Sequence, residues 1–191
     1  TALALIASQG MDGLTVANLA EELGITPGAL YRYFPSKDAL IASLQVRILR
    51  ACREEYEAVC VRAIPCDLDP QPAALLPILL AALVQGELAR TMPAAFGLLA
   101  VSLSDPRQLV GDAEAAAVWN EAMDLIDAVA AQIHAASEMG VIEAGDPAVR
   151  SLLLVFSHNG VLQLSKMARR SPGIIPVWAM ADELADSLLR A

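Results

Sequence analysis

Residues that begin and end helices recur at short intervals near the start of the chain, and they restrict its possible folds. Thr15 precedes apolar residues spaced i, i+3, i+4 and i+7, and a threonine there caps the free amide groups of a helix. Gly24 ends this pattern. Thr26 followed by Pro27 opens a second helix, which Pro35 stops after barely two turns. The pattern therefore predicts two short helices joined by a tight turn.

The rest of the chain also favours helices. Aromatic residues make up only 4% of the chain, and no long run of alternating Val, Ile, Thr and Tyr indicates a strand. Ser36 is placed to cap a longer helix, Gly140 to end one, and Asp146 with Pro147 to open another. We predict an all-α fold. Further helical runs are expected at about 73–90, 93–102, 113–139 and 146–167, followed after the break at 171–173 by a last helix with Trp178, Leu184 and Leu188.

Charge and proline content divide the chain into two modules. Hydrophobic residues make up 56% of the chain and charged residues 18%, which excludes an intrinsically disordered protein. Residues 1–50 carry four basic and four acidic groups, so the formal net charge of −9 belongs to the remainder. Residues 64–72, IPCDLDPQP, are the candidate junction. We predict a module at 1–50, whose last helix continues to about residue 62, and an acidic module at 63–191.

The same features indicate a cytoplasmic protein. The longest stretch without a charged residue, Pro70–Gly86, has 17 residues and three prolines. It is shorter than the roughly 20 apolar residues of a membrane-spanning helix. The chain opens with neither a basic segment nor a small-residue cleavage site, which argues against a secretion signal. Its three cysteines, Cys52, Cys60 and Cys66, cannot all pair with one another, as expected in a reducing compartment.

The two short helices have the spacing of a helix-turn-helix, in which the second helix enters the major groove of DNA. The second helix, Pro27 to about Phe34, is too short to be a structural pillar. Pro27, Gly28 and Ala29 are small enough to allow close approach to base edges. The alternative is that both helices are simply part of a helical core.

Three polar side chains follow the small residues of the second helix. The hydroxyl groups of Tyr31 and Tyr33 could bind phosphates, although both rings could instead pack in the core or at a domain junction. Lys37 lies in the first turn of the next helix and adds a positive charge where exposed amides already favour an anion. We expect all three to contact the DNA backbone.

This stretch closely resembles the DNA-binding domain of the tetracycline-repressor (TetR) family of transcriptional regulators. The matching features are Gly10, T-V-x-x-L-A at 15–20, L-G-I-T at 23–26 and L-Y-R-Y-F-P-S-K-D-A-L at 30–40. The resemblance is strong over about the first 50 residues. Beyond them it rests on general layout and on GVIEAGDPA, which precedes a helix containing FSHNG. Members usually have several more residues, often basic, before the first helix, so we expect the contacts of such an arm to be missing here.

The resemblance assigns roles to individual residues and a function to the chain. Thr15, Tyr31, Tyr33 and Lys37 would contact phosphates, and Thr26, Pro27, Gly28 and Ala29 would face the bases. The acidic module would bind a small molecule and form a homodimer, in which the two long helices at 113–139 and 146–167 make a four-helix bundle. The expected function is that of a repressor released from double-stranded operator DNA by an apolar ligand.

The ligand site can be predicted only by residue type. The candidates are large or polar residues within small, apolar runs, for each of which core or dimer packing is the alternative: Trp119, Met123, Phe156, His158 and Asn159. His134, His158, Cys60 and Cys66 form a conceivable metal set but lack metal-binding spacing, and redox sensing by a thiol is a further alternative. Hydrolase, phosphate-loop and dinucleotide motifs are missing, so we expect neither enzyme activity nor a cofactor.

A second function remains open. A helical small-molecule carrier or interaction protein could have kept this fold without useful affinity for DNA. The absence of net positive charge in residues 1–50 favours this alternative, because DNA binding draws much of its affinity from phosphate contacts.

Overall fold

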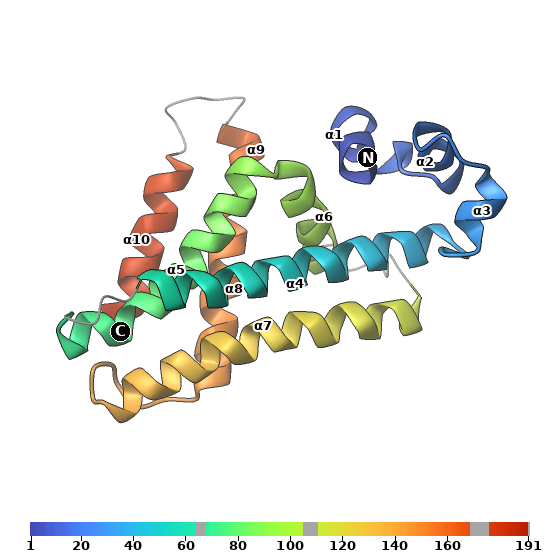
Figure 1. Ribbon diagram of the computed structural model, residues 1–191. Helices are drawn as coiled ribbons and strands as arrows, with labels where there is room; N and C mark the ends of the chain where they lie inside the picture. The colour runs from blue at the N-terminus through green and yellow to red at the C-terminus, as the bar shows by residue number, and fades with distance from the viewer. Residues whose placement is uncertain (64–67, 105–110, 169–175, 191) are drawn as a thin grey trace. The chain divides into compact units, whose positions relative to one another are not determined.

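A computed structural model describes residues 1–63, 68–104, 111–168 and 176–190 of the chain (Figure 1). These residues form helices and connecting turns and contain no strand, which confirms the predicted all-α fold. The helices are α1 (Ala2–Gly13), α2 (Val16–Glu22), α3 (Pro27–Tyr31), α4 (Lys37–Ala63), α5 (Pro70–Thr91), α6 (Pro93–Ser104), α7 (Asp112–Glu138), α8 (Pro147–Gln163), α9 (Ser165–Ala168) and α10 (Val177–Arg190).

The helices group into two compact units. The first unit contains Thr1–Leu49 and Thr91–Ala122, and the second contains Arg50–Arg90 and Met123–Ala191. Helices α4 and α7 each supply residues to both units. The predicted module boundary at residue 50 coincides with one of these divisions. However, α6 and the start of α7 group with the N-terminal helices, because α1 packs against α6.

Side-chain caps begin α2, α3 and α4 as the sequence predicts. The hydroxyl oxygen of Thr15 accepts a hydrogen bond from the amide of Asn18 at 3.0 Å. The hydroxyl of Thr26 accepts from the amide of Ala29 at 3.3 Å, and that of Ser36 from the amide of Ala39 at 3.0 Å. Each bond satisfies one of the amide groups that a helix start leaves free.

Two glycines of the first unit adopt backbone conformations that other residues rarely tolerate. Gly24 has a φ of 66° directly after α2 and turns the chain toward α3. Gly10 has a φ of 74° and interrupts α1, so that residues 11–13 form a separate turn. The core beneath these helices is apolar and includes Leu5, Leu14, Leu19, Leu30 and Leu40.

The second unit has its own apolar core. Tyr56 of α4, Ile78 and Leu80 of α5, Val129 of α7 and Leu154 of α8 belong to one buried cluster. Helix α8 also packs against α10. Burial of Ile78 and Leu80 accounts for part of the apolar character of α5.

Helix α5 is also the one helix among the described residues that is long and apolar enough to cross a membrane. Such a helix is weak evidence for a membrane protein, because core helices of soluble proteins have the same length and composition. Ile78 and Leu80 face the core of the second unit. The sequence underestimated the length of this helix, since α5 begins at Pro70 rather than at about residue 73.

Two helices are shorter than predicted. Helix α3 ends at Tyr31 rather than near Phe34, because the amides of Tyr33 and Phe34 both donate to the carbonyl of Leu30 in a tight turn. Helix α8 ends at Gln163, and the short α9 follows instead of a continuous helix to Met167. The predicted break at 171–173 and Cys66 lie outside the described residues.

Candidate nucleic-acid interface

Helix α3 is held in the first unit by a single buried side chain. Leu30 is buried, whereas Thr26, Pro27 and Gly28 are exposed and Ala29 is half-buried. Helices α2 and α3 pack against each other. The helix therefore anchors itself through Leu30 and presents the rest of its short surface to solvent. This is the geometry that a recognition helix needs to enter a groove.

The fold does not require a glycine at position 28. Its φ is not positive, and a Cβ atom added to it would meet nothing within 4 Å. Glycine inside a helix is less favourable than alanine, so the position carries a cost without a benefit to the fold. The open space at Gly28 lies on the exposed surface of α3.

Both tyrosines that follow are exposed. Tyr31 has 50% and Tyr33 has 77% of its surface accessible. Their exposure leaves the hydroxyl groups available to a partner, although half of the surface of Tyr31 is covered within the protein. Arg32 between them is also exposed, and the sequence analysis did not include it. Its place between the two tyrosines was the signal that could have indicated it.

Lys37 is half-buried and does not point freely into solvent. Its ammonium group donates a hydrogen bond of 2.9 Å to the carbonyl oxygen of Met11. Nearby, the side-chain amide of Asn18 donates to the carbonyl oxygen of Gly13 at 2.9 Å. Sequence reasoning missed both acceptors, because a backbone carbonyl leaves no signal in the residue type.

The ligand candidates lie in different environments. His158 and Asn159 are buried in α8, where the side-chain amide of Gln163 donates to Asn159 at 2.7 Å. Phe156 on the same helix is exposed, and Met123 on α7 is half-buried. Trp119 is exposed and belongs to the first unit, so the structure does not bring it together with the other four within one unit.

His158 has two neighbours from other helices of the second unit. A Cβ atom added to Gly86 would lie 4.0 Å from Nε2 of His158 and 4.0 Å from Cζ3 of Trp178. Gly86 of α5 therefore lies close to both rings, with room for a methyl group in its place. Sequence reasoning did not select Gly86 or Trp178 for this region.

The cysteines of α4 are poorly suited to thiol chemistry. Burial raises the pKa of Cys52 to about 11, and burial likewise raises the pKa of Cys60. The thiolate is the reactive form, so both groups are weak nucleophiles at neutral pH. Within the ranges that the structure describes, no three His, Cys, Asp or Glu side chains are grouped so that they could hold a metal ion.

The fold and the exposed α3 together define a helical protein with a helix-turn-helix of the DNA-binding type. Residues 1–44 match the sequence profile described as "Bacterial regulatory proteins, tetR family". The profile match covers the helix-turn-helix and the start of α4, and the fold along the whole chain is similar to that of the TetR family transcriptional regulator PfmR from Thermus thermophilus, with a TM-score of 0.68 at 18% identity.

The relatives match only the start of the chain. The nucleoid occlusion factor SlmA of Haemophilus ducreyi is 48% identical over 44 residues, which are 23% of this chain. The class C tetracycline repressor protein of Escherichia coli is 47% identical over 49 residues, 26% of this chain. In both cases the match spans 22% of the relative's length.

Likeness over the whole chain comes from solved structures. The transcriptional regulator FadR of Bacillus subtilis, solved in complex with stearoyl-CoA, superposes with a TM-score of 0.71. The superposition covers 98% of this chain and 94% of FadR at 16% identity. Because the identity is only 16%, this likeness establishes the fold and nothing about function.

Proposed function

We propose that the protein is a transcriptional repressor that binds operator DNA as a homodimer in the cytoplasm and leaves it when an apolar small molecule binds. The observation that carries this proposal is the surface of α3, which buries Leu30, half-buries Ala29 and exposes Pro27, Gly28 and Tyr31. A helix with one anchor contributes little to a core, so its exposed face is best explained by an external partner. The family profile favours a regulator over an enzyme.

The DNA contacts divide into two groups in this proposal. Thr26, Pro27, Gly28 and Ala29 face the bases, where small side chains permit close approach. Phosphates are bound by the hydroxyl groups of Thr15, Tyr31 and Tyr33 and by the ammonium group of Lys37. The capping bond of Thr15 uses its oxygen as an acceptor, so its hydroxyl hydrogen remains available for a phosphate.

A homodimer is required because one short helix reads too few base pairs. Two recognition helices about one turn of DNA apart, roughly 34–36 Å, would read a pseudo-palindromic site. Val149, Leu153 and Phe156 are exposed on α8 at a spacing that puts them on one face. Trp178 and Met180 are exposed on α10, which packs against α8. We therefore assign the dimer interface to α8 and α10.

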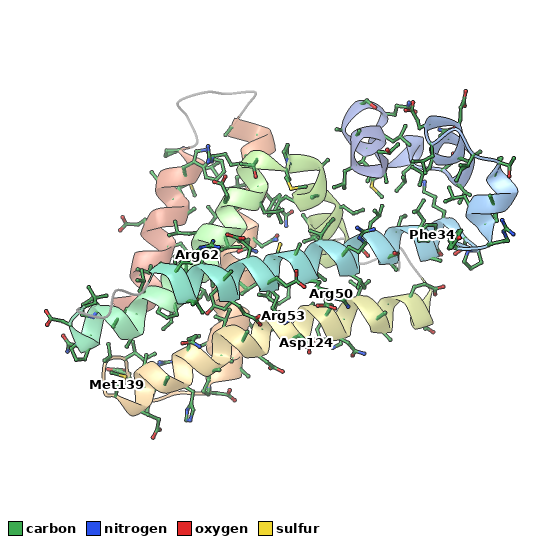
Figure 2. All side chains as sticks on the ribbon, viewed as in Figure 1. Phe34, Arg50, Arg53, Arg62, Asp124 and Met139 are labelled. Carbon is green, nitrogen blue, oxygen red and sulfur yellow. The ribbon has the colours of Figure 1, made fainter. Side chains whose placement is uncertain are left out.

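Helix α7 is less suitable for this interface. In the second unit its exposed residues are mostly polar, including Asp124, Asp127, His134 and Glu138 (Figure 2 labels Asp124). A stable homodimer interface is more apolar than this face. The pairing of α7 with α8, expected from the sequence, is therefore replaced in our proposal by α8 with α10.

The ligand is proposed to bind in the second unit near His158 and Asn159, with Met123 as a further candidate. Buried polar groups among apolar side chains are typical of small-molecule sites. The complex of FadR with stearoyl-CoA supports a ligand with a long apolar part. Phe156 and Trp119 are exposed and contribute less to this proposal.

Selection of bound sequences from random duplex DNA tests the function directly. We expect recovery of a pseudo-palindromic sequence, and an affinity for it that falls steeply with salt because phosphate contacts release counterions. Absence of any preferred duplex at low salt would favour the carrier alternative, which the zero net charge of residues 1–50 supports. Binding of fatty-acid probes without DNA binding would give that alternative direct support.

A further inference from the structure

The turn at the end of α1 leaves backbone carbonyl groups that the helix cannot satisfy. Gly10 interrupts α1, and the chain becomes extended at Leu14. The carbonyls of residues 11–13 therefore lie at a helix end, where they carry partial negative charge. The carbonyl of Gly13 accepts a backbone hydrogen bond of 3.0 Å from the amide of Thr15. Side-chain donors to the carbonyls of Met11 and Gly13 come from elsewhere in the first unit.

The two donors come from the elements on either side of the recognition helix. Asn18 in α2 donates from its side-chain amide to the carbonyl of Gly13, 2.9 Å away. Lys37, in the first turn of α4, donates from its ammonium group to the carbonyl of Met11, also 2.9 Å away. We call these two hydrogen bonds the carbonyl clamp.

The two donors of the clamp lie on either side of α3 in the sequence. Asn18 precedes this helix and Lys37 follows it, and Leu30 is the one buried side chain of α3. A five-residue helix with a single anchor depends on its flanking segments for its orientation. Because both segments are tied to the same short turn, the clamp fixes the entry to and the exit from α3.

Lys37 can donate to the carbonyl of Met11 and to a DNA phosphate at the same time. An ammonium group has three N–H donors, and the bond to Met11 uses one of them. A lysine side chain has large rotational freedom, which a hydrogen bond at a helix end reduces. The bond to Met11 therefore holds the charge at a fixed place at the start of α4.

We propose that Lys37 is a positioning residue for the recognition helix: by binding the Met11 carbonyl it sets the orientation of α3, in addition to any phosphate contact. Asn18 has the same positioning role without a charge. The inference rests on the proposed DNA-binding function, but the clamp itself can be measured without DNA.

The first measurement is hydrogen exchange of the free, full-length protein. Lys37→Met keeps most of the apolar stem and removes both the donor and the charge, whereas Asn18→Ala removes an uncharged donor. We expect both variants to speed the exchange of amides in residues 11–16 and in α3, by about tenfold for the loss of one such bond. Lys37→Arg retains charge and donors, and we expect it to restore slow exchange.

The second measurement is DNA affinity over a series of salt concentrations, with the duplex selected above. A phosphate contact alone predicts that Lys37→Met lowers the salt slope by about 0.9 and costs no affinity on extrapolation to 1 M salt. Positioning predicts that an affinity loss of about tenfold persists at 1 M salt. Asn18→Ala should show the same persistent loss with an unchanged slope.

The possible outcomes separate the two proposals. Wild-type exchange in Lys37→Met, together with a loss confined to the salt slope, would overturn the positioning role. If Lys37→Met does not fold, Lys37→Arg provides the test. Wild-type hydrogen exchange in Lys37→Arg would support the clamp, whereas a Lys37→Arg protein as unstable as Lys37→Met would overturn it. If the wild-type protein selects no duplex, the proposed function fails, while the exchange data still test the clamp.

Discussion

Gln45 and Leu98 are joined by a buried hydrogen bond inside the first unit: the side-chain amide of Gln45 donates to the carbonyl oxygen of Leu98 at 3.1 Å. Gln45 is only 1% exposed. The bond ties the start of α4 to α6, two elements that are 53 residues apart in the sequence. Since α4 follows directly after α3, this polar contact contributes to holding the helix-turn-helix on its support.

Replacing Gln45 by methionine should destabilise the first unit, because a side chain of similar size would then lack the donor. We expect a loss of about 1–2 kcal/mol in the free energy of unfolding, measured by urea titration. Arg47→Met, an exposed position on the same helix, is the control and should change stability by less than about 0.5 kcal/mol. Equal stability of the two variants would show that the bond contributes nothing.

Gly28→Ala should separate stability from DNA binding. The added methyl group meets nothing inside the protein, so stability should stay equal or rise by up to about 1 kcal/mol. In the complex the same group would enter the space between α3 and the base edges, and affinity should fall. Gly97→Ala is a matched control, because Gly97 also lies in a helix of the first unit with open space around it. Unchanged DNA affinity in Gly28→Ala would show that no base approaches this position.

Tyr31→Phe removes only the hydroxyl group of a half-exposed ring. The melting temperature should stay nearly unchanged, whereas the loss of a phosphate hydrogen bond should weaken DNA binding by about 1–3 kcal/mol. Calorimetry and a mobility-shift assay would measure the two effects. A variant that loses stability and keeps its affinity would assign Tyr31 a packing role instead.

Cys52 should resist alkylation until the solution is strongly alkaline. Burial raises the pKa of its thiol from 9.0 to about 11, so the folded protein keeps the proton that an unfolded chain has begun to lose at pH 9. At neutral pH the thiol is protonated in both the folded and the unfolded chain, so stability has its full value there. Stability falls as the pH rises from 9 toward 11, because the unfolded chain loses this proton first. We expect iodoacetamide to modify Cys52 about fiftyfold more slowly than a free cysteine at pH 9, as followed by peptide mapping, because about half of the free thiol but only about 1% of the Cys52 thiol is ionised there. Fast modification in the folded protein would contradict the burial of this thiol.

The sequence predicted the interactions that are local and missed those that are distant. The caps at Thr15, Thr26 and Ser36 join residues three positions apart, so residue type and spacing are sufficient to indicate them. The bond from Lys37 to Met11 spans 26 residues and ends on a backbone carbonyl. Nothing in the sequence at Met11 marks it as an acceptor, and only the folded chain brings the two together.

The candidate site follows the same division. Residue type correctly indicated that α3 has small residues on its surface, but exposure depends on how Leu30 docks against its neighbours. Both long helices have enough apolar residues for an interface. Periodicity alone could not tell that α7 exposes polar residues in the second unit while α8 exposes Val149 and Leu153, because the choice of buried face is made by packing.

Leu153→Glu tests the proposed dimer interface on α8. Leu153 is 54% exposed, so a charge there costs the isolated protomer little, whereas an apolar dimer interface would have to bury that charge without a partner. We expect a folded monomer in sedimentation, and operator affinity that falls sharply because one recognition helix remains. Val61→Glu is the matched control, since Val61 is 83% exposed on α4 and lies outside the proposed interface. A Leu153→Glu protein that sediments as a dimer and binds the operator normally would move the interface away from this face of α8.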